Sequence, residues 1–258
     1  MPGSSSWGFA TALQLNKPAT ARPSFYALSP GGWRDLVTIL HPPYTAWHLS
    51  YVAIGAALAP TFVLWRLGAA LGAFLLALGV ACHALDELAG RPLGTRLSRR
   101  ALIALASGGL GGAVAIGVVG VVILSAWLIP LVIIGVFLAL AYNLELFGGR
   151  FHTDLWFAVA WGGFPAFTGW FVETLDVRVE GVLIALGCSL ISVAQRRLST
   201  PARELRRRTV AVEGSQTLRD GDVRALDVER LLAPLEGTLS ALWKAMVVLA
   251  VALVVRRL

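Results

Sequence analysis

The stretch 101-ALIALASGGLGGAVAIGVVGVVILSAWLIPLVIIGVFLALAYNLEL-146 decides the fold of this chain, because it carries a single charged residue, Glu145. The hydrocarbon core of a bilayer is about 30 Å thick and an α-helix rises about 1.5 Å per residue, so roughly 20 apolar residues cross it. The stretch is about twice that length. It predicts two membrane-spanning helices joined by a turn near Ser125, Ala126 and Trp127.

The rest of the chain repeats this apolar pattern. Of the 258 residues, 57% are hydrophobic and only 14% are charged, whereas a soluble domain carries about a quarter charged residues. Further apolar segments predict spans at about 44–64, 68–88, 155–171, 179–193 and 239–255. The expected fold class is therefore an all-α, polytopic membrane helix bundle of about seven transmembrane helices.

These segments divide the chain into four expected regions. We predict a cytoplasmic N-terminal tail that ends in a short amphipathic piece, a transmembrane core, a basic cytoplasmic loop and a C-terminal transmembrane helix. Their bounds are 1–40, 41–195, 196–237 and 238–258, respectively.

Basic residues are concentrated in alternate loops, mainly those that follow the second, fourth and sixth spans. The positive-inside rule places these loops and the N-terminus in the cytoplasm, so we expect a multi-pass protein of the plasma membrane. The other loops hold only Arg66 and Arg178 as basic residues, and the terminal pair Arg256 and Arg257 also falls on that opposite side. The same rule accounts for the net charge of +7. We therefore expect membrane lipid as a partner and no nucleic acid.

A first polar cluster, His83, Asp86 and Glu87, ends the second span, and Arg91 follows within about one turn. Residues three and four apart share one face of a helix. Carboxylate oxygens suit Mg²⁺, and the guanidinium group of arginine matches phosphate oxygens. The cluster is therefore a candidate metal and diphosphate site. The alternative is the polar margin at which any helix leaves the bilayer.

A second polar cluster lies at the same predicted membrane face, at the end of the fourth span. Its residues are Tyr142, Asn143, Glu145, Arg150, His152 and Asp154. Polar side chains inside a span are costly and usually face a cavity or a partner. The alternative is a polar network that holds helices together. His48, near the start of the first span, is expected to be an interfacial or packing residue.

Two blocks of sequence resemble the UbiA-type superfamily of intramembrane prenyltransferases. The block 91-RPLGTRLSRRALIALA-106 is similar to the Arg-Pro-Leu loop that follows the second span in that family. The block 141-AYNLELFGGRFHTDLWFAVAWGGFPAFTGWF-171 is similar to its fourth and fifth spans. The resemblance covers about residues 40 to 195 and implies a UbiA-like fold.

The resemblance implies transfer of an isoprenoid chain from a prenyl diphosphate to a lipophilic or aromatic acceptor inside the bilayer. Asp86 and Glu87 would act in catalysis by holding Mg²⁺, which neutralises the leaving diphosphate. Tyr142 and Asn143 would be the other catalytic residues, lining the cavity near the acceptor. The predicted substrate-binding residues are His83, Arg91, Arg150, Arg196 and Arg197.

The sequence departs from the family pattern in both of its acidic motifs. Cys82 and His83 stand where the first motif has Asn and Asp, and 193-VAQRRLSTPARELRRR-208 contains no Asp where the second motif is expected. Arginines of that segment, Arg203 included, could instead contact a phosphate directly. An alternative function is therefore a non-catalytic, UbiA-like membrane protein that binds an isoprenoid or lipid, or serves as a subunit of a membrane assembly. Whether the chain is an enzyme stays open.

Overall fold

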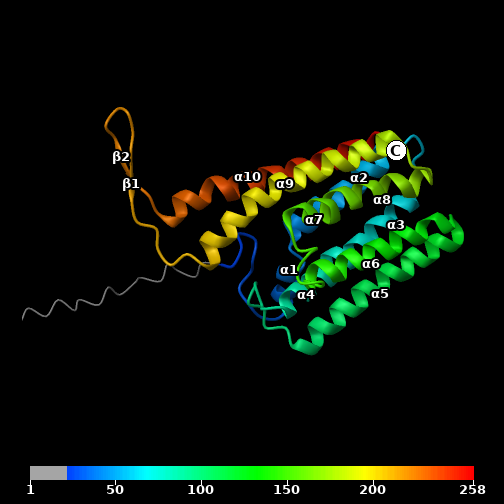
Figure 1. Cartoon of the computed structure of the whole chain (residues 1–258), viewed down its shortest axis with the longest axis horizontal. Coiled ribbons are helices and arrows are strands. Elements are labelled where there is room, and N and C mark those ends of the chain that lie inside the picture. Colours follow the sequence, from blue (N-terminus) through cyan, green and yellow to red (C-terminus); the bar gives the residue numbers. More distant parts are fainter. Residues whose placement is uncertain (1–21) are drawn as a thin grey trace, which may run out of the picture.

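The computed structural model describes residues 22–258 and shows a bundle of long helices that lie side by side (Figure 1). Residues 1–21, about half of the predicted N-terminal tail, lie outside the described part. The tail ends in a short helix, α1 (Trp33–Ile39), whose Trp33 is 69% exposed. The amphipathic piece predicted there is therefore helical.

Among residues 22–258, six helical segments are long and apolar enough to cross a membrane. The first runs over Leu64–Leu88 as α3 (Leu64–Phe74), a π-helix η1 (Leu75–Cys82) and α4 (His83–Leu88). The others are α5 (Arg99–Ile123), η2–α6 (Ala126–Asn143), the joined α7–η3–α8, α9 (Val179–Arg207) and α10 (Val228–Val255). The expected all-α, polytopic architecture is confirmed.

The segment that decided the fold contains two helices, α5 and α6, with the turn at Leu124 and Ser125. The first predicted span corresponds to α2 (Pro42–Leu58), which has 17 residues and lies at the lower limit for crossing a bilayer. Most of α2 is buried in the bundle, so its neighbours, and not lipid, surround it.

Helix α2 packs closely against α8 (Phe164–Thr174), which continues α7 (Asp154–Ala158) and the π-helix η3 (Val159–Gly163). A Cβ atom on Gly55 would lie 1.9 Å from the Ala166 carbonyl oxygen, and one on Gly169 would lie 2.1 Å from that of Val52. Only glycine permits this approach, because the backbones themselves are in contact at both positions.

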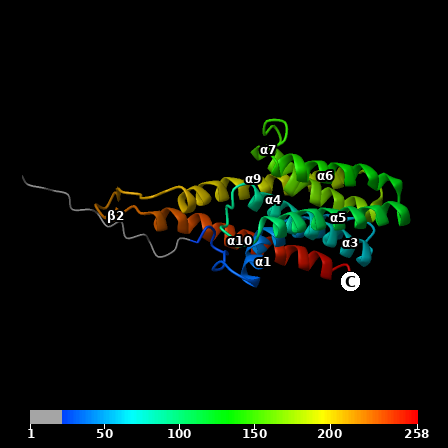
Figure 2. The ribbon, with the colours of Figure 1, turned by 90° about the horizontal axis from the view of Figure 1, so that it is seen from below.

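Residues 196–237, predicted as a loop, are helical at both ends, over about half of their length. Helix α9 continues to Arg207, α10 already begins at Val228, and both helices project beyond the rest of the bundle (Figure 2). An apolar stripe at helical spacing explains the extension, since residues of the two helices share one core: Leu198, Ala202 and Leu205 of α9, with Leu232, Leu235 and Leu239 of α10. A small antiparallel hairpin, β1 (Ser215–Thr217) and β2 (Val223–Ala225), joins them.

Candidate functional site

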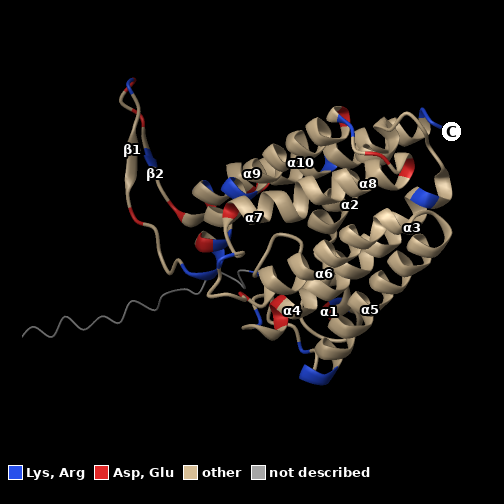
Figure 3. Ribbon diagram, turned by 45° about the vertical axis from the view of Figure 1, so that its right-hand side comes forward, with Lys and Arg blue, Asp and Glu red and all other residues tan. Residues whose placement is uncertain are grey.

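Charged residues gather at the two ends of the helices, with uncharged ribbon between them (Figure 3). The end that carries α4, the start of α7 and the last turns of α9 holds most of the predicted site residues. We call this the inner end, and we define the inner polar cluster as Tyr44, His48, His83, Asp86, Tyr142, His152, Arg196, Arg203 and Arg207.

The Asp86 carboxylate is the acidic group of this cluster, and it is free to bind a ligand. It is partly buried on α4 and makes no hydrogen bond or ion pair with any residue of the described part of the chain. The positive charges of Arg203, Arg207 and Arg196, all on α9, act on it. The Asp86 carboxylate can therefore accept a hydrogen bond, and its role as a Mg²⁺ ligand stays a prediction.

Glu87, predicted as a second Mg²⁺ ligand, is instead a structural residue. It is fully buried, and its carboxylate accepts hydrogen bonds from the backbone N–H groups of Leu93 (3.0 Å) and Thr95 (2.8 Å) and from the Thr95 hydroxyl (2.8 Å). Arg91 closes the same loop by donating to the carbonyl oxygens of Thr95 and Leu97. We therefore assign both side chains to the fold of the loop that follows α4.

An arginine face lies along the last turns of α9. Arg196, Arg203 and Arg207 are seven and four residues apart, which places them on one side of a helix. The Nε atom of Arg196 lies 2.8 Å from a carboxylate oxygen of Asp154, and its guanidinium group lies 5.2 Å from the centre of the Phe157 ring. This pairing fixes one edge of the Arg196 guanidinium group.

Arg203 is the central member of this face and is partly buried. Within residues 22–258 it has no carboxylate partner, and its one recorded hydrogen bond runs 3.3 Å to the Thr200 hydroxyl on its own helix. Tyr44 and Tyr142 lie close enough to influence it electrostatically. Arg207 donates to the Pro23 carbonyl oxygen at 3.0 Å and so holds the N-terminal segment beside the cluster.

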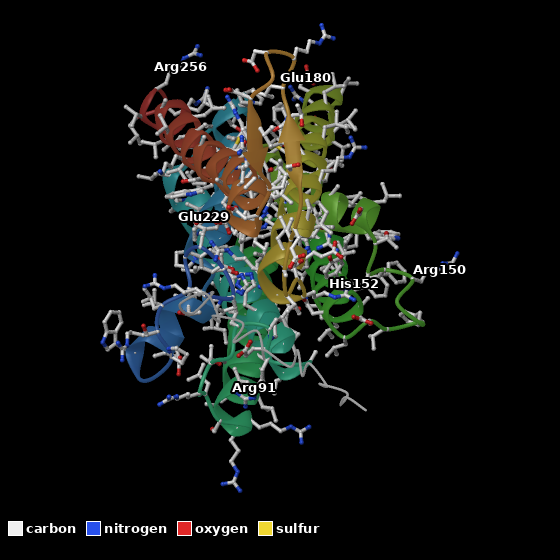
Figure 4. The ribbon with its side chains drawn as sticks, turned by 90° about the vertical axis from the view of Figure 1, so that its left-hand side faces the viewer. Arg91, Arg150, His152, Glu180, Glu229 and Arg256 are labelled. Carbon is white, nitrogen blue, oxygen red and sulfur yellow. The ribbon has the colours of Figure 1, made fainter. Side chains whose placement is uncertain are left out.

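Two predicted arginines lie elsewhere. Arg150 is exposed and points away from the helices, whereas the nearby His152 lies against the bundle (Figure 4). Arg197 is also exposed and lies on a different side of α9 from Arg203. The structure therefore does not bring these two residues into the inner polar cluster.

Tyr142 belongs to the cluster, but the Asn143 amide is used within its own helix. The Tyr142 ring stacks on the His152 ring, with 4.4 Å between centres, and meets Trp161 edge to face. The Asn143 amide donates to the Ala139 carbonyl oxygen at 2.6 Å. Tyr142 can therefore line a site, while Asn143 caps the end of α6.

All four histidines lie at the inner end, and three of them are held in the same way. In each of the three, Nδ1 lies next to a backbone carbonyl oxygen, which can only accept a hydrogen bond, so Nδ1 carries the proton. The distances are 2.8 Å from His48 to Trp161, 3.1 Å from His83 to Gly79 and 3.0 Å from His152 to Tyr142. The fourth, His41, stacks on His83 with 4.0 Å between ring centres. His48, predicted as an interfacial or packing residue, is therefore also a member of the inner polar cluster. The apolar residues around it in the chain did not indicate this.

An apolar cavity of about 560 Å³ extends from this end towards the other one. Its walls come from α3, η1, α5, α6, η3 and α8. Cys82 and Trp161, at its inner limit, lie on the two π-helices. Asp86 follows Cys82 by four residues, or about one helical turn, so the polar cluster and the cavity are adjacent along one helix.

The chain matches no protein-family profile, no curated protein and no solved structure. Within the described residues, no three His, Cys, Asp or Glu side chains are grouped so that they could hold a metal ion.

Proposed function

We propose that this chain is an integral membrane protein that binds a prenyl diphosphate or a related phosphate-headed lipid. The phosphate would lie on the arginine face of α9, and the apolar chain would occupy the cavity behind Cys82. This proposal adopts the binding function that the UbiA resemblance suggested, with Arg203 in the central role.

The observation that carries the proposal is the state of Arg203. A charge that is partly removed from water is costly unless it meets an opposite charge. Arg203 makes no ion pair within residues 22–258, although the Asp86 carboxylate is near enough to be influenced by its charge, and Arg196 and Arg207 add positive charge beside it. A phosphate group would supply the missing negative charge, and its oxygens match the hydrogen-bonding geometry of guanidinium groups.

The cavity supports an amphiphile over a free phosphate ion. Its volume of about 560 Å³ falls in the range of roughly 300–1,000 Å³ that is usual for small-molecule sites. Its lining is almost entirely apolar, apart from Arg66 and Thr168. A headgroup at Arg203 and a chain beyond Cys82 would place both parts of one molecule in suitable surroundings.

Prenyl transfer is the second candidate function, and the free carboxylate of Asp86 favours it. Of the two predicted Mg²⁺ ligands, Asp86 is available and Glu87 is not. Mg²⁺ is often bound by one or two carboxylates together with substrate phosphates. When bound, it would neutralise the leaving diphosphate. Asp86 would hold the ion, Arg203 would orient the diphosphate, and Tyr142 would line the acceptor side.

Binding of radiolabelled farnesyl diphosphate to the detergent-purified protein tests both candidates. We expect Arg203→Gln to weaken binding by about tenfold or more, since one charge-assisted hydrogen bond contributes about 1.5–3 kcal/mol. Arg150→Gln, which removes an exposed arginine of the same end, is the matched control and should bind like wild type. Equal binding by all three proteins would contradict the proposal. Mg²⁺-dependent binding that Asp86→Asn abolishes would favour prenyl transfer.

We further propose that the inner end faces the cytoplasm and that the membrane is the plasma membrane. Arginines of the 91–100 loop and of α9 lie at this end, which agrees with the positive-inside rule. Because both native cysteines are buried, single cysteines placed at Arg150 and Val177 can report the orientation. A membrane-impermeant thiol reagent added to intact cells should label the cysteine at position 177 and not the one at 150. The reverse pattern would overturn the orientation.

A further inference from the structure

The inner polar cluster has two sides with opposite hydrogen-bonding character. The arginine face of α9 can only donate hydrogen bonds, because a guanidinium group has no acceptor. The opposite side consists of Asp86 and the three histidines whose Nδ1–H groups face backbone carbonyls. A neutral imidazole that donates from Nδ1 presents a lone pair at Nε2. This second side therefore consists of acceptors.

No side chain of the described part of the chain donates a hydrogen bond to this acceptor side. Among residues 22–258, neither Asp86 nor the Nε2 atoms of His48, His83 and His152 have a hydrogen-bond partner. His48 and His83 are 4% and 9% exposed, so bulk water does not surround them. Among the described residues, the histidine Nε2 atom that is both fully buried and unpaired is that of His41. The unpaired Nε2 atoms of His48, His83 and His152 instead keep contact with open space, so a ligand can reach them.

A phosphate group cannot serve this second side, because its ionised oxygens are themselves acceptors. The matching chemistry is a hydroxyl group, which donates one hydrogen bond and carries no charge. From this complementarity we infer that the site binds a hydroxyl-bearing ligand, with phosphate on the arginines and one or more hydroxyl groups on His48, His83, His152 and Asp86. The inference rests on the phosphate site proposed above and extends it.

The hydroxyl groups can belong to the headgroup of the same lipid or to a separate acceptor molecule bound beside it. In both cases they would donate to Nε2 atoms whose tautomer is already fixed by the carbonyl oxygens of Trp161, Gly79 and Tyr142. Fixed outer partners of this kind orient a histidine towards its ligand. The three imidazoles are therefore specificity-determining residues and not packing residues.

A matched lipid pair tests the inference. Short-chain phosphatidylglycerol and phosphatidylethanol carry the same phosphodiester charge, but only the former has free hydroxyl groups on its headgroup. We expect the wild-type protein to bind phosphatidylglycerol roughly tenfold more tightly, which is the effect of one or two net hydrogen bonds. In a second arm, binding of farnesyl diphosphate is measured with and without added glycerol. Tighter binding only in this arm would place the hydroxyl groups on a separate molecule.

The double substitution His48→Asn and His83→Asn isolates the histidine lone pairs. An asparagine amide can replace Nδ1–H as the donor to the carbonyl oxygen, but it has no group at the position of Nε2. The variant should keep its thermal stability and its affinity for phosphatidylethanol while losing the preference for hydroxyl groups. Arg203→Gln, by contrast, should weaken the binding of both lipids, because it removes the phosphate site and leaves the histidines in place.

Two results would overturn the inference. One is equal affinity for the two lipids together with no effect of glycerol on the binding of farnesyl diphosphate. The other is stoichiometric Zn²⁺ in the purified wild-type protein and none in the double variant, because the Nε2 atoms would then be metal ligands.

Discussion

The two ends of the helix bundle use their charged side chains differently. At the outer end, Glu173 is buried and accepts a hydrogen bond from the Val63 backbone N–H at 2.7 Å, while Arg66 donates to the carbonyl oxygens of Val172 and Glu173. These charged groups bind backbone and close the turn between α2 and α3. At the inner end, Asp86 and Arg203 have no comparable partners in residues 22–258. One carboxylate oxygen of Glu173 and the Nε atom of Arg66 also have no partner among the described residues, so the difference between the two ends lies in the hydrogen bonds to distant backbone, which the side chains of Asp86 and Arg203 lack.

The same contrast occurs within two adjacent residues of α4. Glu87 points into the loop and satisfies three donors, whereas its neighbour Asp86 faces the inner polar cluster. Successive positions on a helix point about 100° apart, so the two carboxylates of one acidic pair serve different purposes. An acidic pair in a sequence therefore need not be a pair of metal ligands.

The largest expected effect concerns stability and separates Glu87 from Asp86. Glu87→Ala leaves two buried backbone donors and one hydroxyl without a partner, and each costs about 1–3 kcal/mol. We expect this variant to unfold at a clearly lower temperature than wild type in detergent. Asp86→Ala, the matched control, should unfold at nearly the wild-type temperature. If the two substitutions lower the unfolding temperature equally, Glu87 and Asp86 do not differ in their contribution to stability, and the proposed contrast between them is wrong.

The next effect concerns the cavity and the length of the bound chain. Ala77 lines the cavity, so Ala77→Trp should fill part of it and weaken the binding of farnesyl diphosphate by about tenfold. Binding of dimethylallyl diphosphate, which has a much shorter chain, should change little. Ala104→Trp on the exposed face of α5 controls for the added bulk. If both diphosphates lose affinity equally, the chain does not lie in this cavity.

The smallest expected effect is a dependence of stability on pH through His41. Burial, and then the neighbouring His83, lowers the pKa of His41 well below its ordinary value. The unfolded chain therefore takes up a proton near pH 6.5 that the folded chain does not, and stability falls as the pH drops through that value. His41→Asn removes this group, and asparagine tolerates the left-handed backbone, with φ of 46°, at this position. An unfolding temperature with the same pH dependence in both proteins would contradict this assignment.

The sequence predicted the membrane helices well because hydropathy and length are local properties. The turn near Ser125 follows from the apolar stretch alone. The helical extensions of α9 and α10 could not be predicted from local hydropathy. Their stripe of apolar residues stabilises a helix only when the two helices pack against each other. Polar composition alone therefore missed the helical ends of 196–237, whereas the stretch 208–227 between them is not helical.

The candidate site was predictable in part. Asp86, Tyr142 and Arg196 could be selected from their positions at span ends, and all three lie in the inner polar cluster. The roles of Glu87, Arg91 and Asn143 could not be predicted, because their partners belong to loop and helix backbone whose placement depends on the fold. His48 was predicted as an interfacial or packing residue; it is buried, and its hydrogen bond to the Trp161 carbonyl oxygen, 113 residues away, could not be predicted from its neighbours in sequence.

The most direct test of the central claim is to locate one bound amphiphile in both of its parts. A farnesyl diphosphate analogue with a photoreactive diazirine at the far end of its chain would be cross-linked to the purified protein, and the labelled peptides would be identified by mass spectrometry. We predict labelling within α3, α5 or α6 along the cavity, and loss of that labelling in Arg203→Gln but not in Arg150→Gln. Labelling confined to the β1–β2 hairpin or to the exposed face of α10, unaffected by Arg203→Gln, would contradict the account.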